Sequence, residues 1–178
     1  MSISTVVDLN PETDRSLRNR RSLYALTTLT LSVVMGLGIV DAFGWFDAYG
    51  VDTDTVRAAG GGYTLEVDYP SVSRPALASP FEITVTRVGG FDGPVTVAVS
   101  RDYLKLWDEN GLVPAPSAET TNGDWVEWEF DPPDVDVLTI YYDARIEPAV
   151  QRGRSGSVAV VDDGRPVVQV EFRTRVRP

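Results

Sequence analysis

The chain has 178 residues, a formal net charge of −10 from 26 acidic and 16 basic residues, and neither cysteine nor histidine. Without these two residue types it can form no disulfide, no thiolate or imidazole zinc site, and no Ser/His or Cys/His nucleophile pair. The acidic balance argues against a nucleic-acid partner, because proteins that bind nucleic acids cluster lysine and arginine.

An uncharged segment of 19 residues, SLYALTTLTLSVVMGLGIV at positions 22–40, is the first element along the chain. As a helix it would be about 28 Å long, which is close to the hydrocarbon thickness of a bilayer. Aromatic side chains of the kind that settle at lipid headgroups follow it, at Phe43, Trp45, Phe46 and Tyr49. We therefore predict a transmembrane helix over residues 22–46 that ends in an outer aromatic belt.

The charges that flank this segment predict its orientation. Four arginines precede it, at positions 15, 18, 20 and 21, and acids follow it, at positions 41, 47, 52 and 54. Because positive charge is retained on the cytoplasmic side, residues 1–21 are predicted to be a basic cytoplasmic tail. The chain is then a single-pass protein of the cell membrane with an extracytoplasmic C-terminal domain.

Three other interpretations of the segment stay open beside the retained anchor. A cleaved signal peptide would use Val40-Asp41-Ala42 as its small-residue site, although its apolar core is usually only about 7 to 15 residues long. Arg20-Arg21-Ser22-Leu23 resembles a twin-arginine signal. A buried core helix fits poorly, because the segment is apolar on every side. We favour the anchor on length.

Residues 47–62 contain three consecutive glycines and no hydrophobic periodicity, so we predict a flexible tether. From Tyr63 onward, apolar and polar residues alternate at period two, as in half-buried strands. This pattern recurs in seven segments, at residues 63–69, 81–85, 95–99, 126–130, 138–146, 158–160 and 168–172. Residues 102–109 fit either a helix or a strand over 103–107.

Turn signals separate these segments and favour antiparallel connections. Gly89 to Pro94 joins the second and third segments, Pro132-Pro133 the fourth and fifth, and Asp163-Gly164 the last two. We therefore predict an all-β fold, in which residues 63–178 form an immunoglobulin-like antiparallel β-sandwich of about seven strands.

Several motifs resemble the second half of the immunoglobulin-like repeats of bacterial surface proteins. They are Tyr103-Leu104 with Pro114-Ala115-Pro116-Ser117, then DWVEWEFDPP at 124–133 and VLTIYYDARI at 137–146. The resemblance covers about residues 63–176 and implies a non-enzymatic surface module. Those proteins often carry tandem copies and this chain has one, which disfavours an adhesive stalk.

Acidic loops are the only metal-site candidates. Asp131, Asp134 and Asp136 lie within six residues, and further acids stand at Asp108-Glu109 and Asp162-Asp163. Calcium prefers such loop oxygens, but the spacing is not that of an EF-hand. A solvated acidic surface is the plainer interpretation, so no metal site is predicted beyond the hypothetical calcium loop Asp131, Asp134 and Asp136.

Among possible binding or catalytic residues, only one tryptophan stands out. Glu127 and Glu129 could form a glycosidase pair, but two residues apart on one strand they fit an exposed polar face better. Of the tryptophans at 107, 125 and 128, only Trp125 is out of phase with the inward-facing set, so it is the binding candidate. Arginines at 173, 175 and 177 share one side of the last strand, where they could protect a sheet edge or face acidic neighbours.

Together these features predict a non-enzymatic, membrane-anchored, extracytoplasmic binding or accessory module. Its expected partner is another membrane or envelope protein, and no cofactor or catalytic residue is predicted. One alternative is a carbohydrate-binding or hydrolytic module that uses Trp125 and the acidic loops. Another is a structural surface or adhesion module.

Overall fold

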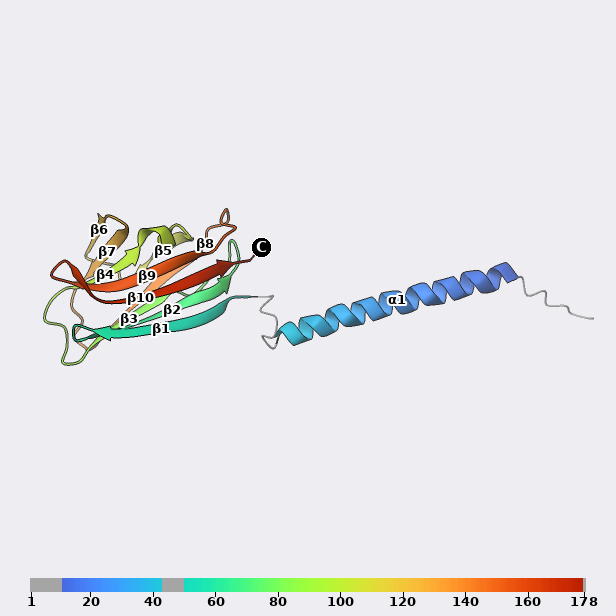
Figure 1. Cartoon of the computed structure of the whole chain (residues 1–178), viewed down its shortest axis with the longest axis horizontal. Coiled ribbons are helices and arrows are strands. Elements are labelled where there is room, and N and C mark those ends of the chain that lie inside the picture. Colours follow the sequence, from blue (N-terminus) through green and yellow to red (C-terminus); the bar gives the residue numbers. More distant parts are fainter. Residues whose placement is uncertain (1–10, 43–49, 178) are drawn as a thin grey trace, which may run out of the picture. The chain divides into compact units, whose positions relative to one another are not determined.

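The computed structural model describes residues 11–42 and 50–177, which belong to two compact units that divide between Tyr49 and Gly50. The first unit contains one long helix, and the second contains all the strands (Figure 1).

Helix α1 spans Pro11–Ala42. Its stretch Arg18–Val40, 23 residues, is long and apolar enough to cross a membrane, and none of it is buried within the structure. Hydroxyls inside this stretch donate to the carbonyl four residues earlier, for example Thr27 Oγ1 to Leu23 O at 2.9 Å, which satisfies them without water. The predicted apolar helix is confirmed, whereas the predicted aromatic belt lies outside the described residues.

The second unit is all-β, as predicted, but it has ten strands rather than seven. They are β1 Asp52–Gly60, β2 Tyr63–Ser73, β3 Glu82–Arg87, β4 Val95–Ser100, β5 Trp107–Val113, β6 Ala118–Asn122, β7 Trp125–Phe130, β8 Val137–Ile146, β9 Arg154–Asp162 and β10 Arg165–Val176. One short helix, α2 at Arg101–Leu104, follows β4. All seven segments predicted from alternation lie at strands.

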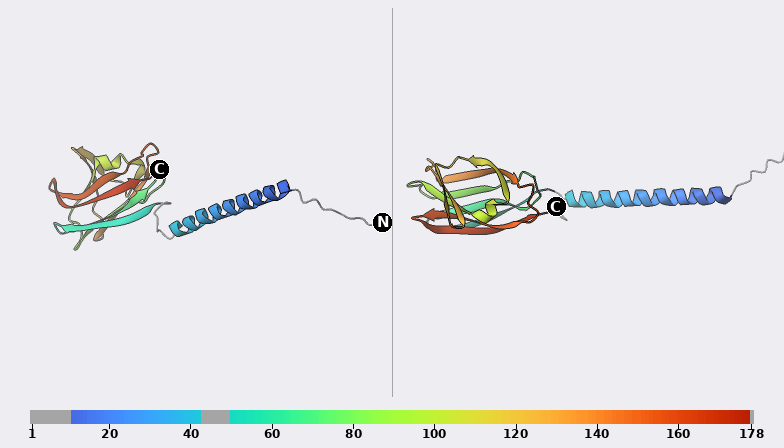
Figure 2. Two further views of the ribbon diagram at one scale, coloured as in Figure 1. Left: turned by 45° about the vertical axis from the view of Figure 1, so that its right-hand side comes forward. Right: turned by 90° about the horizontal axis from the view of Figure 1, so that it is seen from above.

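The strands form one curled sheet, like half of a barrel (Figure 2). Their order in the sheet is β5-β8-β3-β2-β10-β9-β4-β7-β6, and β1 pairs with β2. All pairings are antiparallel except that of β2 with β10, which joins Val72 to Arg175 and Ser73 to Val176. This short parallel contact joins two antiparallel halves, β1-β2-β3-β8-β5 and β10-β9-β4-β7-β6. The β domain is therefore a continuous curled sheet.

The three additional strands correct the sequence prediction. The predicted tether over residues 47–62 is wrong for Asp52–Gly60, because these residues form β1 and pair with β2 along their whole length. The ambiguous stretch at 102–109 is divided between α2 and the start of β5. Strand β6 pairs only with β7 and every one of its residues is exposed.

The core lies between the two halves of the sheet. Its centre is a cluster of aromatic rings around Phe81, which contacts Trp107 at 5.7 Å and Tyr103 at 5.4 Å between ring centroids. The Tyr103 hydroxyl is buried and lies 2.9 Å from Thr174 Oγ1. At Gly156 a Cβ atom would lie 2.8 Å from the Tyr103 ring, so the strand and ring can approach only because this residue is glycine.

Strand directions give the β domain two ends. We call them the Asp52 end, where β1 begins, and the Gly62 end, where the Gly61-Gly62 turn joins β1 to β2. The predicted hairpin at Asp163-Gly164 is confirmed at the Gly62 end, where both residues have positive φ, +48° and +71°, as a type I′ turn requires. The strand directions likewise place each of the remaining loops at one of these two ends.

Candidate functional site: a hollow beside Trp125

Trp125 is the first residue of β7 and lies on the outer face of the sheet. It pairs with Ser100 of β4 and Asn122 of β6. Further along the same strand, Trp128 and Phe130 face the core, and both are almost fully buried. Trp125 itself is half-buried, so it is partly covered rather than fully exposed.

Two alanines form the floor of a hollow beside Trp125. Ala98 of β4 and Ala159 of β9 stand directly opposite each other in the register. Their side chains point away from the core, because they alternate with the core-facing valines of both strands. They are nevertheless only 2% and 1% exposed. Because methyl groups occupy these two positions, a hollow of about 100 Å³ remains above them. The sequence pattern does not predict this floor, and its only signal is an alanine at an outward position in each Val-Ala-Val run.

The walls of the hollow are mostly apolar. Trp125 lies on its lining together with Val161, near the end of β9, and Pro166, near the start of β10. Strand β9 pairs with both β4 and β10, so these walls come from neighbouring strands of one rigid sheet. The site is therefore held by the sheet ladder rather than by a long loop.

Polar groups mark one side of the same hollow. The Asn122 side-chain amide Nδ2 donates to Glu127 Oε1 at 3.1 Å. Glu127 is opposite Ala98, and Glu129 is two residues further along the same face. The expectation that both glutamates lie on the polar face agrees with this register. The hollow thus combines an aromatic wall, an apolar floor and a carboxylate that already accepts one hydrogen bond.

No known family model matches this chain, and no curated protein is similar to it. Its site is therefore interpreted from geometry and chemistry alone.

The structure does not bring the acids of the hypothetical calcium loop together. Within residues 11–42 and 50–177, no three acidic side chains are grouped so as to hold a metal ion. Asp136 instead supports the neighbouring loop: its carbonyl oxygen accepts from Arg87 N at 2.9 Å and its carboxylate from Gly89 N at 3.5 Å. Asp131 and Asp134 are exposed residues of the connection between β7 and β8.

The other acidic candidates also have structural surroundings. Arg145 Nη2 donates to Asp108 Oδ2 at 2.6 Å, and the Tyr142 hydroxyl donates to Glu109 Oε2 at 3.1 Å. Burial, reinforced by the Glu109 carboxylate, raises the pKa of Tyr142 above its usual range. Asp162-Asp163 lies at the β9–β10 hairpin.

The remaining tryptophans of the β domain belong to the core. Trp128 is 2% exposed and stacks on Tyr142 with ring centroids 5.8 Å apart, while Trp107 is 7% exposed and stacks on Phe81. Neither ring is accessible to a ligand, in contrast to Trp125.

The arginines of the last strand have a different position from the expected one. Arg175 lies in the short parallel pairing with Val72, so this part of β10 is not a free edge that the arginines would protect. Arg173 lies further back on β10 and is exposed.

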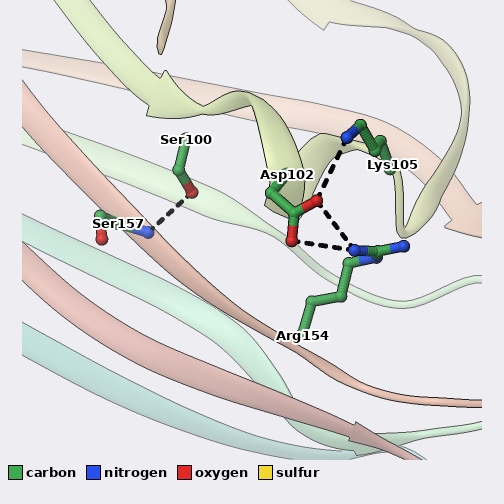
Figure 3. A network of polar contacts seen from close by, with 5 residues as sticks. All are labelled: Ser100, Asp102, Lys105, Arg154 and Ser157. Atoms are coloured by element: carbon green, nitrogen blue, oxygen red, sulfur yellow. Dashed lines mark hydrogen bonds and ion pairs between the residues drawn. The ribbon is translucent and has the colours of Figure 1, made fainter. Parts of the chain in front are cut away.

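A network of ion pairs holds α2 near the first residue of β9 (Figure 3). The Asp102 carboxylate accepts from Lys105 Nζ at 3.2 Å and from Arg154 Nη1 at 2.8 Å. These hydrogen bonds, with Lys105 first and Arg154 second, lower the pKa of Asp102. In the same network, Ser157 N donates to Ser100 Oγ at 3.0 Å. Since the charges satisfy one another, we interpret this network as structural.

Proposed function

We propose that this protein is a membrane-anchored binding module that holds an envelope or membrane protein against the outer face of β4, β7 and β9. The observation that carries this proposal is the hollow beside Trp125. Its volume, about 100 Å³, is well below the roughly 300–1,000 Å³ of typical small-molecule sites. Such a hollow suits a single apolar side chain of a protein partner, because interface hot spots are anchors seated in small pockets.

The apolar helix supports the anchoring part of the proposal. Arg18–Val40 is long enough to span a bilayer, and arginines precede it along the chain. By the positive-inside rule the N-terminus is then cytoplasmic and the β domain extracytoplasmic. The connection from Ala42 to Asp52 contains nine residues, so even fully extended it spans only about 30 Å. A partner in the same membrane is within reach, whereas a distant surface is not.

The strand order supports an immunoglobulin-like arrangement as the finer description of the fold. Strands β2-β3-β8-β5 follow one another like the A-B-E-D half of such domains, and β7-β4-β9-β10 like the C′-C-F-G half. We propose that the curled sheet is a variant of this architecture, in which β1 extends the first half and β6 the second. Domains of this kind commonly act through binding surfaces.

The proposal is tested with a photocrosslinker placed at Thr120, an exposed residue of β6 beside the hollow. We expect one membrane or envelope protein to be captured in intact cells, and the yield to fall at least about tenfold in Trp125→Ala. Val88→Ala, at an exposed residue of the Gly62 end, is the matched control and should leave the yield unchanged.

Two results would overturn the proposal. One is a capture yield that does not depend on Trp125. The other is retention of the protein on cell-wall polysaccharide that is lost in Trp125→Ala, because that result would favour the carbohydrate-binding alternative.

A further inference from the structure

Ionic charge is distributed unevenly between the two ends of the β domain. The loops at the Gly62 end are residues 61–62, 88–94, 114–117, 131–136 and 163–164. They contain five acidic residues and no basic one: Asp92, Asp131, Asp134, Asp136 and Asp163. The strand ends that adjoin these loops add Arg87, Arg165 and Asp162, so this end of the domain remains negative.

The Asp52 end has the opposite balance. Its connecting segments among the described residues are 50–51, 74–81, 101–106, 123–124, 147–153 and 177. They contain five basic residues, Arg74, Arg101, Lys105, Arg152 and Arg177, and three acidic ones, Asp102, Asp124 and Glu147. At the strand ends that adjoin these segments, Arg154 of β9 adds one positive charge and pairs with Asp102, whereas Asp52 of β1 and Glu82 of β3 add two negative charges. The Asp52 end thus has a slight excess of positive charge, in contrast with the Gly62 end.

Two of these basic side chains are available to an external anion. Arg101 of α2 and Arg152 of the β8–β9 loop are exposed, and neither side chain forms an ion pair or hydrogen bond with the described residues. Arg101 also lines an open hollow on the surface together with Lys105 and the acids Asp102 and Asp124.

The two ends of the β domain are far enough apart to respond separately to a charged surface. Strand β1 has nine residues, so the two ends are about 30 Å apart at roughly 3.3 Å per residue. At physiological salt the Debye length is only about 8 Å. A charged surface therefore acts on the nearer end alone, and an anionic surface attracts the Asp52 end and repels the Gly62 end.

We propose that the Asp52 end of the β domain rests against the anionic lipid headgroups of the membrane that α1 spans. This inference rests on the proposed membrane anchor, because the nine residues between Ala42 and Asp52 hold this end within reach of the headgroups. Basic residues near a membrane surface are attracted to anionic lipids. The strands then stand away from the membrane, and the hollow beside Trp125 faces sideways, toward a neighbour in the same bilayer.

The test uses the full chain in lipid nanodiscs, where both bilayer faces are accessible. Since the sequence contains no cysteine, Ala149→Cys at the Asp52 end and Ala115→Cys at the Gly62 end each give one labelling site. Both alanines are exposed loop residues. Energy transfer from a dye on each cysteine to acceptor-labelled headgroups then reports which end is nearer the bilayer.

With about 30% phosphatidylglycerol in phosphatidylcholine, we expect transfer from position 149 to be at least about twice that from position 115. The ratio should fall in pure phosphatidylcholine or in about 0.5 M NaCl, because both remove the electrostatic attraction and leave only the tether to α1. Arg101→Glu combined with Arg152→Glu should lower it likewise. Arg165→Glu, at an exposed arginine of the Gly62 end, is the matched control and should not.

Equal transfer from the two positions on the anionic bilayer would overturn the inference. So would a difference that is insensitive to lipid charge and salt, because the short connection to α1 would then account for it. A second measurement separates this failure from failure of the anchor. The full chain is reconstituted into vesicles of the same lipids, and the vesicles are washed with alkaline carbonate. Release of the protein would overturn both proposals, whereas retention with equal transfer would overturn this one alone.

Discussion

Strand β7 carries two tryptophans three residues apart, and the two faces of the sheet give them different surroundings. Trp128 is 2% exposed and is packed against Tyr142 from the opposite half of the sheet. Trp125 lies on the outer face, where two alanines leave a hollow beside it. A tryptophan in this strand therefore stabilises the core when it faces inward and stays accessible when it faces outward. The alternation of side chains along the strand decides which of the two occurs.

Replacing both tryptophans in turn is the strongest test of this difference. We expect Trp128→Ala to lower the free energy of unfolding by about 3–5 kcal/mol, because it creates a cavity in the packed core. Trp125→Ala should cost less than about 1.5 kcal/mol, because its ring is already partly in water. Denaturant unfolding of the full chain in detergent measures both values. Equal losses would mean that Trp125 is a core residue.

A smaller effect is expected where the inner face holds a polar pair. Tyr103→Phe keeps the ring but removes the hydroxyl that lies 2.9 Å from Thr174 Oγ1, so we expect a loss of about 1–2 kcal/mol. Thr174→Val should cost a similar amount. The double variant should lose less than the sum of the two, because neither polar partner is then left unsatisfied. Strict additivity in the same unfolding measurement would contradict this pairing.

The smallest effect concerns the exposed carboxylate of Asp102 and depends on pH. The hydrogen bonds from Lys105 and Arg154 hold its pKa in the folded protein below the ordinary aspartate value of about 3.9, so its stabilising contribution is present above about pH 4 and is lost as the pH falls through the lower, folded value. We therefore expect the melting temperature of Asp102→Asn to fall less between pH 5 and pH 2 than that of the parent. Parallel pH curves for the two proteins would show that the network with Lys105 and Arg154 does not stabilise the fold.

The sequence predicted the strands that bury alternate residues, and it failed where a strand buries few residues or where a register shift interrupts the alternation. In β2 and β8 alternate residues enter the core, so the period of two is visible. In β6 all five residues are exposed, and no alternation can exist. Strand β1 buries only part of Val56 and Ala58 against the core, and in β5 a register shift between Glu109 and Gly111 interrupts the pattern.

The candidate site was predictable only in part, for a related reason. Trp125 could be identified from its phase within β7 alone. The floor of the hollow requires Ala98 and Ala159 to be neighbours, and this follows from the pairing of β4 with β9, two strands separated by more than fifty residues of sequence. Loop acids such as Asp136 bind nearby backbone amides, which is a local role that spacing does not distinguish from metal binding.

The pairing of β1 also has a mechanical consequence. A force applied at Asp52 along the axis of β1 would meet nine residue pairs with β2 whose hydrogen bonds lie across this axis. The ladder is therefore loaded in shear, with all its rungs sharing the force, rather than unzipped one rung at a time. The segment that looked like a slack linker in the sequence would thus transmit pulling force directly into the sheet.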